Sequence, residues 1–146
     1  MRFKAVFYFL FLSVFMLFTS CENTLVFHDS HESKRQNTPF SDAVETDDFF
    51  FLSGQIGRDH STGILAEGIQ EQTKQVIENI ENVLKYHNSS LDRVVKCTVI
   101  LRNIEDFQAF NEVYTQYFTN KPARTTFSAA GLAANALIEI DVIVTK

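Results

Sequence analysis

The residues with the clearest chemical potential are an arginine and a glutamate on two consecutive strand-like segments. Arg124 lies in the segment Pro122–Ser128, and Glu139 lies in the segment Ala136–Val144. Charged residues are uncommon in strand interiors, where β-branched and aromatic residues are favoured. A guanidinium group offers a planar fork of donors that fits a carboxylate. The two residues therefore indicate either an internal ion pair or part of an anion-binding catalytic site.

Length and charge restrict the class of protein that could carry such a site. The chain has 146 residues, 45% of them hydrophobic, and a formal net charge of −5. A chain of this length suggests a single domain. An acidic chain without a basic stripe argues against nucleic acid as a partner.

The first 20 residues have the pattern of a bacterial lipoprotein signal peptide. Arg2 and Lys4 precede an apolar run that is shorter than the roughly 20 residues of a membrane span. The segment Phe18–Cys21 resembles a lipobox, although leucine is more usual than phenylalanine at its first position. This pattern predicts lipidation of Cys21 and an exported, membrane-anchored protein on the periplasmic or cell-surface side of a bacterium. An uncleaved signal anchor and plain secretion are the alternatives.

Three sections follow from this pattern. A signal peptide is expected at residues 1–20, a lipidated cysteine with a flexible tether at 21–37, and a globular domain at 38–146. In the tether, the spacing of His28 and His31 would permit a metal site, but no nearby residues complete one.

Hydrophobic periodicity predicts two helices, over about 69–87 and 104–119. Strands are expected at 42–46, 48–56, 94–101, 123–129 and 137–145. Right-handed crossovers then place both helices on one face of a single sheet, in two layers. The opposite face is partly apolar, which predicts oligomerisation through it.

Cys97 is the cysteine that remains once Cys21 is assigned to lipid. It lies in a β-branched run, and it has no cysteine with which to form a disulfide. We expect a small buried hydrophobe at this position, with a catalytic thiol as the alternative.

Five short segments occur in an order and spacing that are typical of one family. They are Phe51–Ile56, Val94–Val99, Phe110–Tyr114, Pro122–Thr125 and Ile138–Asp141. With these segments the chain resembles the Rid (YjgF-type) family of reactive imine/enamine deaminases, over about residues 38–145. The resemblance implies a chorismate-mutase-like α+β fold, a two-layer sandwich of a mixed sheet with two helices on one face. It also implies a homotrimer with a central barrel and with ligand pockets between neighbouring subunits.

The resemblance also implies an activity and its residues. Family members hydrolyse 2-imino acids and their enamine tautomers, such as 2-iminopropanoate and 2-aminoacrylate, to 2-keto acids and ammonia, without metal or cofactor. The family pattern places the substrate carboxylate on Arg124 and the attacking water near Glu139, which can shuttle its proton. Main-chain groups around Ser53 and Gly54 line the pocket. The alternative is a non-catalytic trimer that binds small carboxylate metabolites.

One segment departs from the family pattern. Active deaminases of the family supply a tyrosine hydroxyl to the pocket from a Gly-Pro-Tyr-type segment, whereas this chain has Thr38-Pro39-Phe40-Ser41. Phe40 keeps the aromatic ring as part of the substrate pocket but lacks the hydroxyl. If that hydroxyl helps to hold the water, hydrolysis is expected to be slower, by up to the roughly 10²–10⁴-fold effect of a positioned acid–base group.

Overall fold

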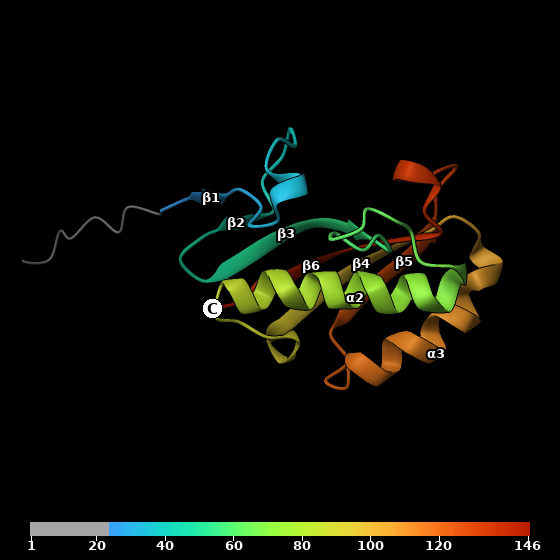
Figure 1. The fold of residues 1–146 in the computed structure, drawn as a ribbon. Coiled ribbons are helices and arrows are strands. Elements are labelled where there is room, and N and C mark those ends of the chain that lie inside the picture. The colour runs from blue at the N-terminus through green and yellow to red at the C-terminus, as the bar shows by residue number, and fades with distance from the viewer. Residues whose placement is uncertain (1–23) are drawn as a thin grey trace, which may run out of the picture.

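The computed structural model describes residues 24–146, and its elements are shown in Figure 1. The strands are β1 Val26–His28, β2 Ala43–Glu45, β3 Phe49–Ile56, β4 Val94–Leu101, β5 Ala123–Ser128 and β6 Ile138–Thr145. The α-helices are α2 Gly68–Tyr86 and α3 Phe107–Tyr117. Short 3₁₀ turns are η1 Ser33–Arg35, η2 Leu91–Arg93, η3 Ile104–Asp106 and η4 Ala133–Asn135.

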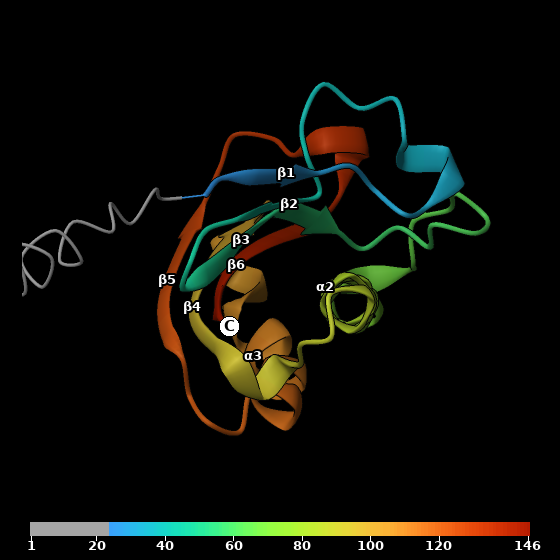
Figure 2. The same ribbon diagram turned by 90° about the vertical axis from the view of Figure 1, so that its left-hand side faces the viewer.

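The described strands form one mixed sheet in the order β1-β2-β3-β6-β4-β5. β4 and β5 are parallel and are joined by α3, while the other neighbouring pairs are antiparallel. Both long helices pack on the same side of the sheet, as the view along the layers shows (Figure 2). The predicted two-layer α+β architecture is therefore confirmed.

The core lies between the helices and the inner face of the sheet. Periodicity explains it, because alternate residues of β6 and one stripe of α2 consist of branched apolar side chains. The fully buried examples on these two elements are Val76, Ile77, Ile80, Ile138, Ile140 and Val144. Burial of this apolar surface is the main stabilising term for such a fold.

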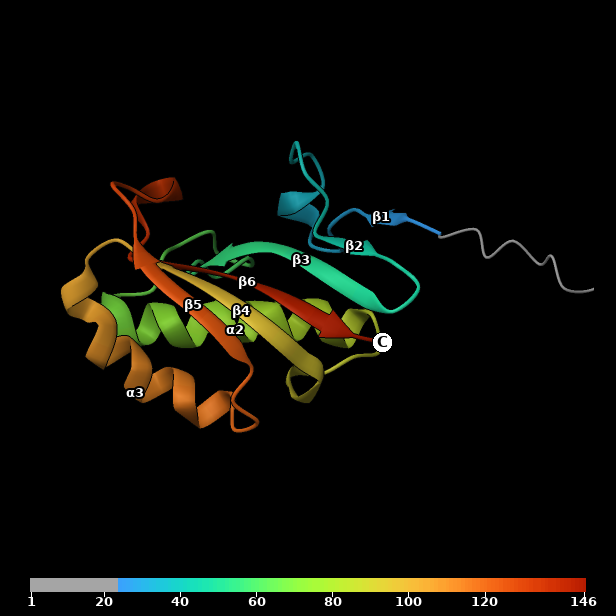
Figure 3. The same cartoon turned by 180° about the vertical axis from the view of Figure 1, so that it is seen from behind.

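The outer face of the sheet has no helix over it among residues 24–146 (Figure 3). Strand alternation places large apolar side chains there as well as in the core. Phe51 and Phe127 are 43% and 45% exposed. An apolar sheet face of this kind agrees with the expectation that other protein surface covers it.

The segment before residue 38 contains regular structure that the sequence pattern did not indicate. Residues 26–28, expected to belong to a flexible tether, form β1 and pair with β2. His28 Nε2 lies 2.8 Å from Glu45 Oε2, and the ring of His31 stacks on Tyr86. These contacts hold the segment on the domain. No cluster of three or more potential metal ligands occurs within residues 24–146.

The expected lipoprotein signal peptide and membrane anchor are corrected here. Residues 1–20 and Cys21, to which these assignments belong, lie outside the described residues. Within residues 24–146, none of the helices has the length and apolar character needed to cross a bilayer. The lipoprotein, signal-peptide and anchor assignments therefore have no support and are withdrawn.

Candidate functional site

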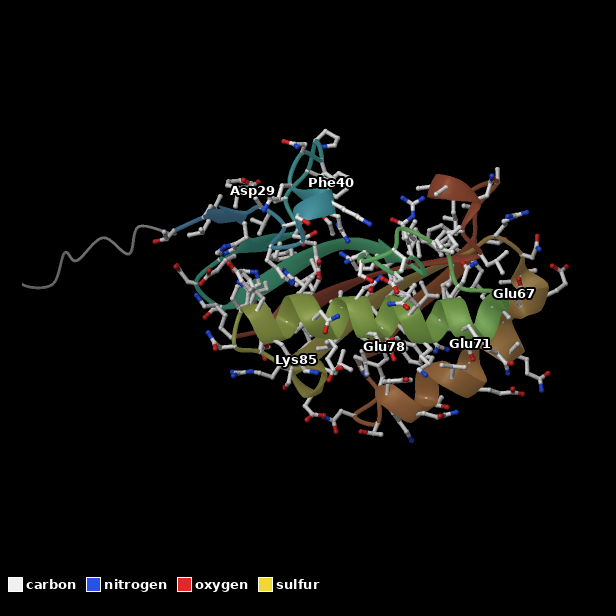
Figure 4. The ribbon with its side chains drawn as sticks, viewed as in Figure 1. Asp29, Phe40, Glu67, Glu71, Glu78 and Lys85 are labelled. Atoms are coloured by element: carbon white, nitrogen blue, oxygen red, sulfur yellow. The ribbon has the colours of Figure 1, made fainter. Side chains whose placement is uncertain are left out.

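A pocket of about 370 Å³ opens on the side of the sheet away from α2. It lies where the loop before β2, the end of β3, the loop after β3 and the η4 turn meet. Its lining comprises Lys34, Arg35, Thr38, Phe40, Gly54, Ile56, Arg58, His60, Gly63, Ala133 and Glu139. Phe40 lies on the loop above the sheet, whereas Glu71, Glu78 and Lys85 mark α2 below it (Figure 4). The volume falls in the range of small-molecule sites.

Glu139 projects into this pocket because of strand alternation. Its neighbours Ile138 and Ile140 face the core, so its side chain points to the outer face of β6. The ladder between β3 and β6 is interrupted between Leu52 and Gln55, and Ile56 is the register partner of Glu139, whose side chain extends over Gly54. A Cβ atom at Gly54 would lie 2.1 Å from Glu139 Oε1. The absence of a side chain at Gly54 is therefore what lets the carboxyl group lie over β3.

The carboxyl group of Glu139 has no hydrogen-bond or ion-pair partner among residues 24–146. Desolvation by burial, with a smaller contribution from Asp141, raises the pKa of Glu139 above its usual value. A carboxyl group in such a setting can accept a proton more readily than an exposed glutamate. Its oxygens are also available to a water molecule or a ligand.

The loop that carries Phe40 is fastened by a buried ion pair. Arg35 Nη2 lies 2.7 Å from Asp42 Oδ1, and the Asp42 side chain is 3% exposed. Arg35 Nη1 also donates to Gln55 Oε1 and, at 3.0 Å, to His60 Nε2. This network joins η1, β2, β3 and the following loop into one wall of the pocket.

Ser53 lies beside the pocket and does not line it. Its Oγ donates to the Ser41 carbonyl oxygen at 2.6 Å, and its backbone N–H donates to the Asp42 carbonyl at 2.9 Å. Ser53 therefore holds the Phe40 loop against β3. Its neighbour Gly54 forms part of the pocket wall itself.

Arg124 lies on the other face of the sheet, away from this pocket. It shares its register position with Cys97 and Val142, both of which face the helices. Arg124 Nη1 donates to Asn111 Oδ1 at 2.9 Å, and its guanidinium lies 4.6 Å from the centre of the Tyr114 ring. An Arg124–Glu139 ion pair within one chain is therefore excluded.

The strands that contain Arg124 and Glu139 are consecutive in the chain but are not neighbours in the sheet. β4 lies between β5 and β6, so Arg124 and Glu139 are not on adjacent strands and the internal ion pair, one of the two alternatives, does not form. The family resemblance implies instead that both residues belong to one ligand pocket shared between subunits. Within a single chain, the structure brings together Phe40, Gly54 and Glu139 and leaves Arg124 at the β5 edge.

Cys97 is fully buried between the sheet and α3. Burial raises the pKa of its thiol to about 11, so the group stays protonated at neutral pH. The structure thus supports the expectation of a small buried hydrophobe and gives the thiol no nucleophilic role.

Arg58 and His60 also line the pocket, although neither belongs to the five segments that carry the family resemblance. Their loop is held by Asn79 of α2, which is 2% exposed and donates to the carbonyls of Ile56 and Arg58 at 3.1 and 2.8 Å. Asn79 is a polar residue within the buried stripe of a helix. Because buried polar groups require hydrogen-bond partners, its position was the sequence signal for the attachment of this loop.

Comparisons with known proteins agree on the family. The family profile described as "Endoribonuclease L-PSP" matches residues 32–146. A RutC family protein of Saccharolobus solfataricus is 47% identical over 110 residues, which are 74% of this chain and 87% of that protein. The human 2-iminobutanoate/2-iminopropanoate deaminase is 41% identical over 107 residues, which are 72% and 78% of the two chains.

Solved structures show the same fold. The crystal structure of E. coli TdcF with bound serine superposes with a TM-score of 0.76 at 26% identity, covering 83% of this chain and 98% of that one. Fold and site together define a small α+β protein with a metabolite-sized pocket at the sheet. The chain belongs to the L-PSP family, also known as the YjgF-type or Rid family, as its five motifs indicated.

Proposed function

We propose that this protein hydrolyses 2-imino acids, such as 2-iminobutanoate and 2-iminopropanoate, to 2-keto acids and ammonia. The observation that carries the proposal is the Glu139 carboxyl group over Gly54, which has no partner within the described part of the chain and lies in a pocket of metabolite size. The human relative that is named a deaminase for these two imines supports the same reaction class.

The chemistry requires one water molecule and one proton-transfer group. Ionised Glu139 accepts a proton from the water as the water oxygen bonds to the imine carbon, and the C=N π electrons pass to nitrogen. The nitrogen takes up this proton, which gives a carbinolamine. The carbinolamine hydroxyl then gives up its proton to the amine nitrogen, and the C–N bond breaks to release ammonia as the C–O bond becomes the ketone carbonyl. General acid–base catalysis of this kind contributes about 10²–10⁴-fold.

Arg124 is proposed to bind the substrate carboxylate in the pocket of a neighbouring subunit. β5 is the edge strand of the sheet, so its arginine lies at a margin that another copy can approach. The apolar outer face, including Phe51 and Phe127, supplies the surface for assembly into a homotrimer. A bidentate guanidinium–carboxylate contact would then fix the imine carbon near Glu139.

Phe40 is expected to affect the rate of imine hydrolysis. It lines the pocket and is 49% exposed, so an added hydroxyl group would reach the pocket without displacing core residues. We expect Phe40→Tyr to hydrolyse the imine faster than the natural chain. An unchanged rate would mean that the missing hydroxyl is not part of the water site.

The decisive experiment generates 2-iminobutanoate in situ with an amino-acid oxidase and follows its disappearance with purified protein. Acceleration over buffer that is lost in Glu139→Gln supports the proposal. Absence of acceleration in the natural chain, with the assembly intact, would leave the alternative of a non-catalytic carboxylate binder. That alternative predicts saturable binding of 2-oxobutanoate without turnover.

The description of the family names an endoribonuclease, but the charge of this chain favours a small ligand over RNA. The net charge is −5, whereas RNA binding depends on cationic side chains that neutralise phosphates. The positive side chains around the pocket line a space of metabolite size and do not form an extended stripe.

A further inference from the structure

The pocket contains more positive charge than the proposed reaction requires. Binding of the substrate carboxylate is assigned to Arg124 of a neighbouring chain, and Glu139 supplies the base. Yet three further cationic side chains line the pocket in the same chain: Lys34, Arg35 and Arg58. The state of each one shows which of them is available to a ligand.

The guanidinium of Arg35 already has an ion-pair partner and hydrogen-bond acceptors within the protein. Its guanidinium is paired with Asp42 at 2.7 Å and donates to Gln55 and His60. Because a guanidinium can only donate, His60 Nε2 must accept this hydrogen bond and the imidazole is neutral. Burial and the Arg35 charge lower the pKa of His60 in agreement with this assignment. Neither residue adds an available positive charge to the pocket.

Arg58 is in a different state. None of the ion pairs within the described part of the chain involves Arg58, and its Nε atom is buried without a hydrogen-bond partner. A buried donor without a partner is uncommon and indicates a missing acceptor. The Arg58 side chain therefore has hydrogen-bond donors that no protein group among the described residues accepts.

The backbone beneath Arg58 is fixed, which suits a recognition residue. Its carbonyl oxygen accepts from Asn79 at 2.8 Å, its N–H donates to the Ile56 carbonyl at 2.7 Å, and it pairs with Leu65 in an isolated bridge. Gly57 packs so closely on α2 that a Cβ there would lie 2.5 Å from the Gln72 side chain. The arginine thus projects from a rigid support.

Lys34 adds charge from the η1 wall. Its ammonium donates to the Ser61 carbonyl oxygen and forms no ion pair among residues 24–146. With Arg35 neutralised by Asp42, the lining keeps a net positive charge even when Glu139 is ionised. A ligand with a second negative charge would complement it.

We propose that Arg58, assisted by Lys34, binds a second carboxylate at the far end of the substrate, so that the preferred substrates are imines of acidic amino acids. This inference rests on the proposed imine hydrolysis. The 2-carboxylate would bind to the neighbouring chain's Arg124, and the terminal carboxylate of a 2-imino dicarboxylate would accept from Arg58. A guanidinium suits this role because its planar donors match a carboxylate in a bidentate contact.

The test compares 2-iminoglutarate with 2-iminobutanoate, each generated in situ by an oxidase of matching specificity. We expect the natural assembly to have a kcat/KM at least about 10-fold higher for the dicarboxylate, as one charge-assisted contact allows. Arg58→Met, which keeps length and removes charge, should abolish this preference, so that kcat/KM for the dicarboxylate falls to that for 2-iminobutanoate measured in the same variant. Arg93→Met, at an exposed arginine outside the pocket lining, is the matched control and should change neither rate.

A binding measurement separates this inference from the proposed function. Calorimetric titration with 2-oxoglutarate and 2-oxobutanoate needs no turnover, and 2-oxoglutarate should bind more tightly only when Arg58 is present. Hydrolysis of 2-iminobutanoate with no dicarboxylate preference, unchanged by Arg58→Met, would overturn the inference and leave the proposed function standing. Arg58-dependent binding of 2-oxoglutarate without any imine hydrolysis would support the second-carboxylate site and remove the catalytic function.

Discussion

Glu139 is the proposed proton-transfer group, and the burial of its carboxyl group also lowers the stability of the folded state. Its carboxyl group is half-buried and unpartnered within residues 24–146, and its raised pKa means that the folded state favours the protonated form. The folded protein therefore binds a proton at Glu139 more tightly than the unfolded chain does. By linkage, this residue lowers stability as pH rises from the unfolded pKa through the folded pKa.

Replacing Glu139 with glutamine should remove that cost. We expect Glu139→Gln to have a higher Tm than the natural chain at pH 7, because the amide carries no charge to desolvate. The difference should shrink as pH falls toward 4, where the natural carboxyl group is also neutral. Thermal unfolding between pH 4 and 8, at one protein concentration, measures it. Glu105→Gln, at an exposed glutamate, should show no such pH-dependent gain.

Gly54 should be required for activity more than for folding. A Cβ at residue 54 would lie 2.1 Å from Glu139 Oε1 and 2.9 Å from its Cδ, so the carboxyl group must move. Because those atoms end a flexible side chain, the backbone can stay in place. We expect Gly54→Ala to lower kcat/KM for 2-iminobutanoate by at least about 10-fold, as misplacement of a catalytic base does.

Gly131 offers a matched control for that substitution. A Cβ at Gly131 meets no atom within 4 Å, so Gly131→Ala should keep the natural rate. Equal rates in Gly54→Ala and the natural chain would show that the position of the Glu139 carboxyl group is not important for turnover. Circular dichroism of both variants would establish that the fold is retained.

At the scale of elements, α2 does more than cover the sheet. Asn79 links this helix to the loop after β3 through two hydrogen bonds, while exposed Asn82 on the same helix makes none with the loop. Asn79→Ala would remove both hydrogen bonds, so that the Ile56 carbonyl keeps only the Arg58 N–H and the Arg58 carbonyl has no donor among the described residues. We expect a loss of about 1–3 kcal/mol in the free energy of unfolding.

Urea unfolding and amide hydrogen exchange can measure this effect. In Asn79→Ala, exchange should accelerate over residues 57–66, and binding of 2-oxobutanoate should weaken because the pocket wall is less fixed. Asn82→Ala should leave both unchanged. An equally stable Asn79→Ala with unchanged exchange would refute the role of α2 in supporting the pocket.

The sequence predicted the larger elements well because their signals are periodic and local. The segments expected at 94–101 and 69–87 are observed as Val94–Leu101 and Gly68–Tyr86. Such repeats of two and 3.6 residues follow directly from burial on one face. β1 was missed because a strand of three residues at a sheet edge is too short to carry a period.

The hydrophobic pattern could not predict the strand order or the polar contacts that attach a loop to α2. Alternation places Glu139 and Arg124 each on one face of its own strand, but it does not state which strands are neighbours. The position of β4 between β5 and β6 emerges only from long-range pairing. The place of Arg58 in the pocket was likewise not predictable, because it depends on Asn79 in a distant helix.

At the scale of the whole molecule, one chain contains two halves of the proposed site that face apart. The pocket with Glu139 opens on the outer side of the sheet, and Arg124 packs against α3 on the inner side at the edge strand β5. No rotation of side chains can bring them together, because β4 and the sheet plane separate them. The proposed site would therefore be complete only with a second copy of the chain, and the exposed apolar sheet face favours such assembly.

This arrangement predicts that two inactive variants restore each other. Arg124→Ala and Glu139→Gln should each lose most of the imine hydrolysis, but co-expressed with different affinity tags they should form mixed trimers. A site that takes Glu139 from the first variant and Arg124 from the second is intact, and about one third of the interfaces in mixed trimers have this combination. Tandem affinity purification isolates the mixed assemblies, and the tagged single variants serve as controls. Mixed trimers no more active than either variant alone would show that the site does not combine these residues from different chains.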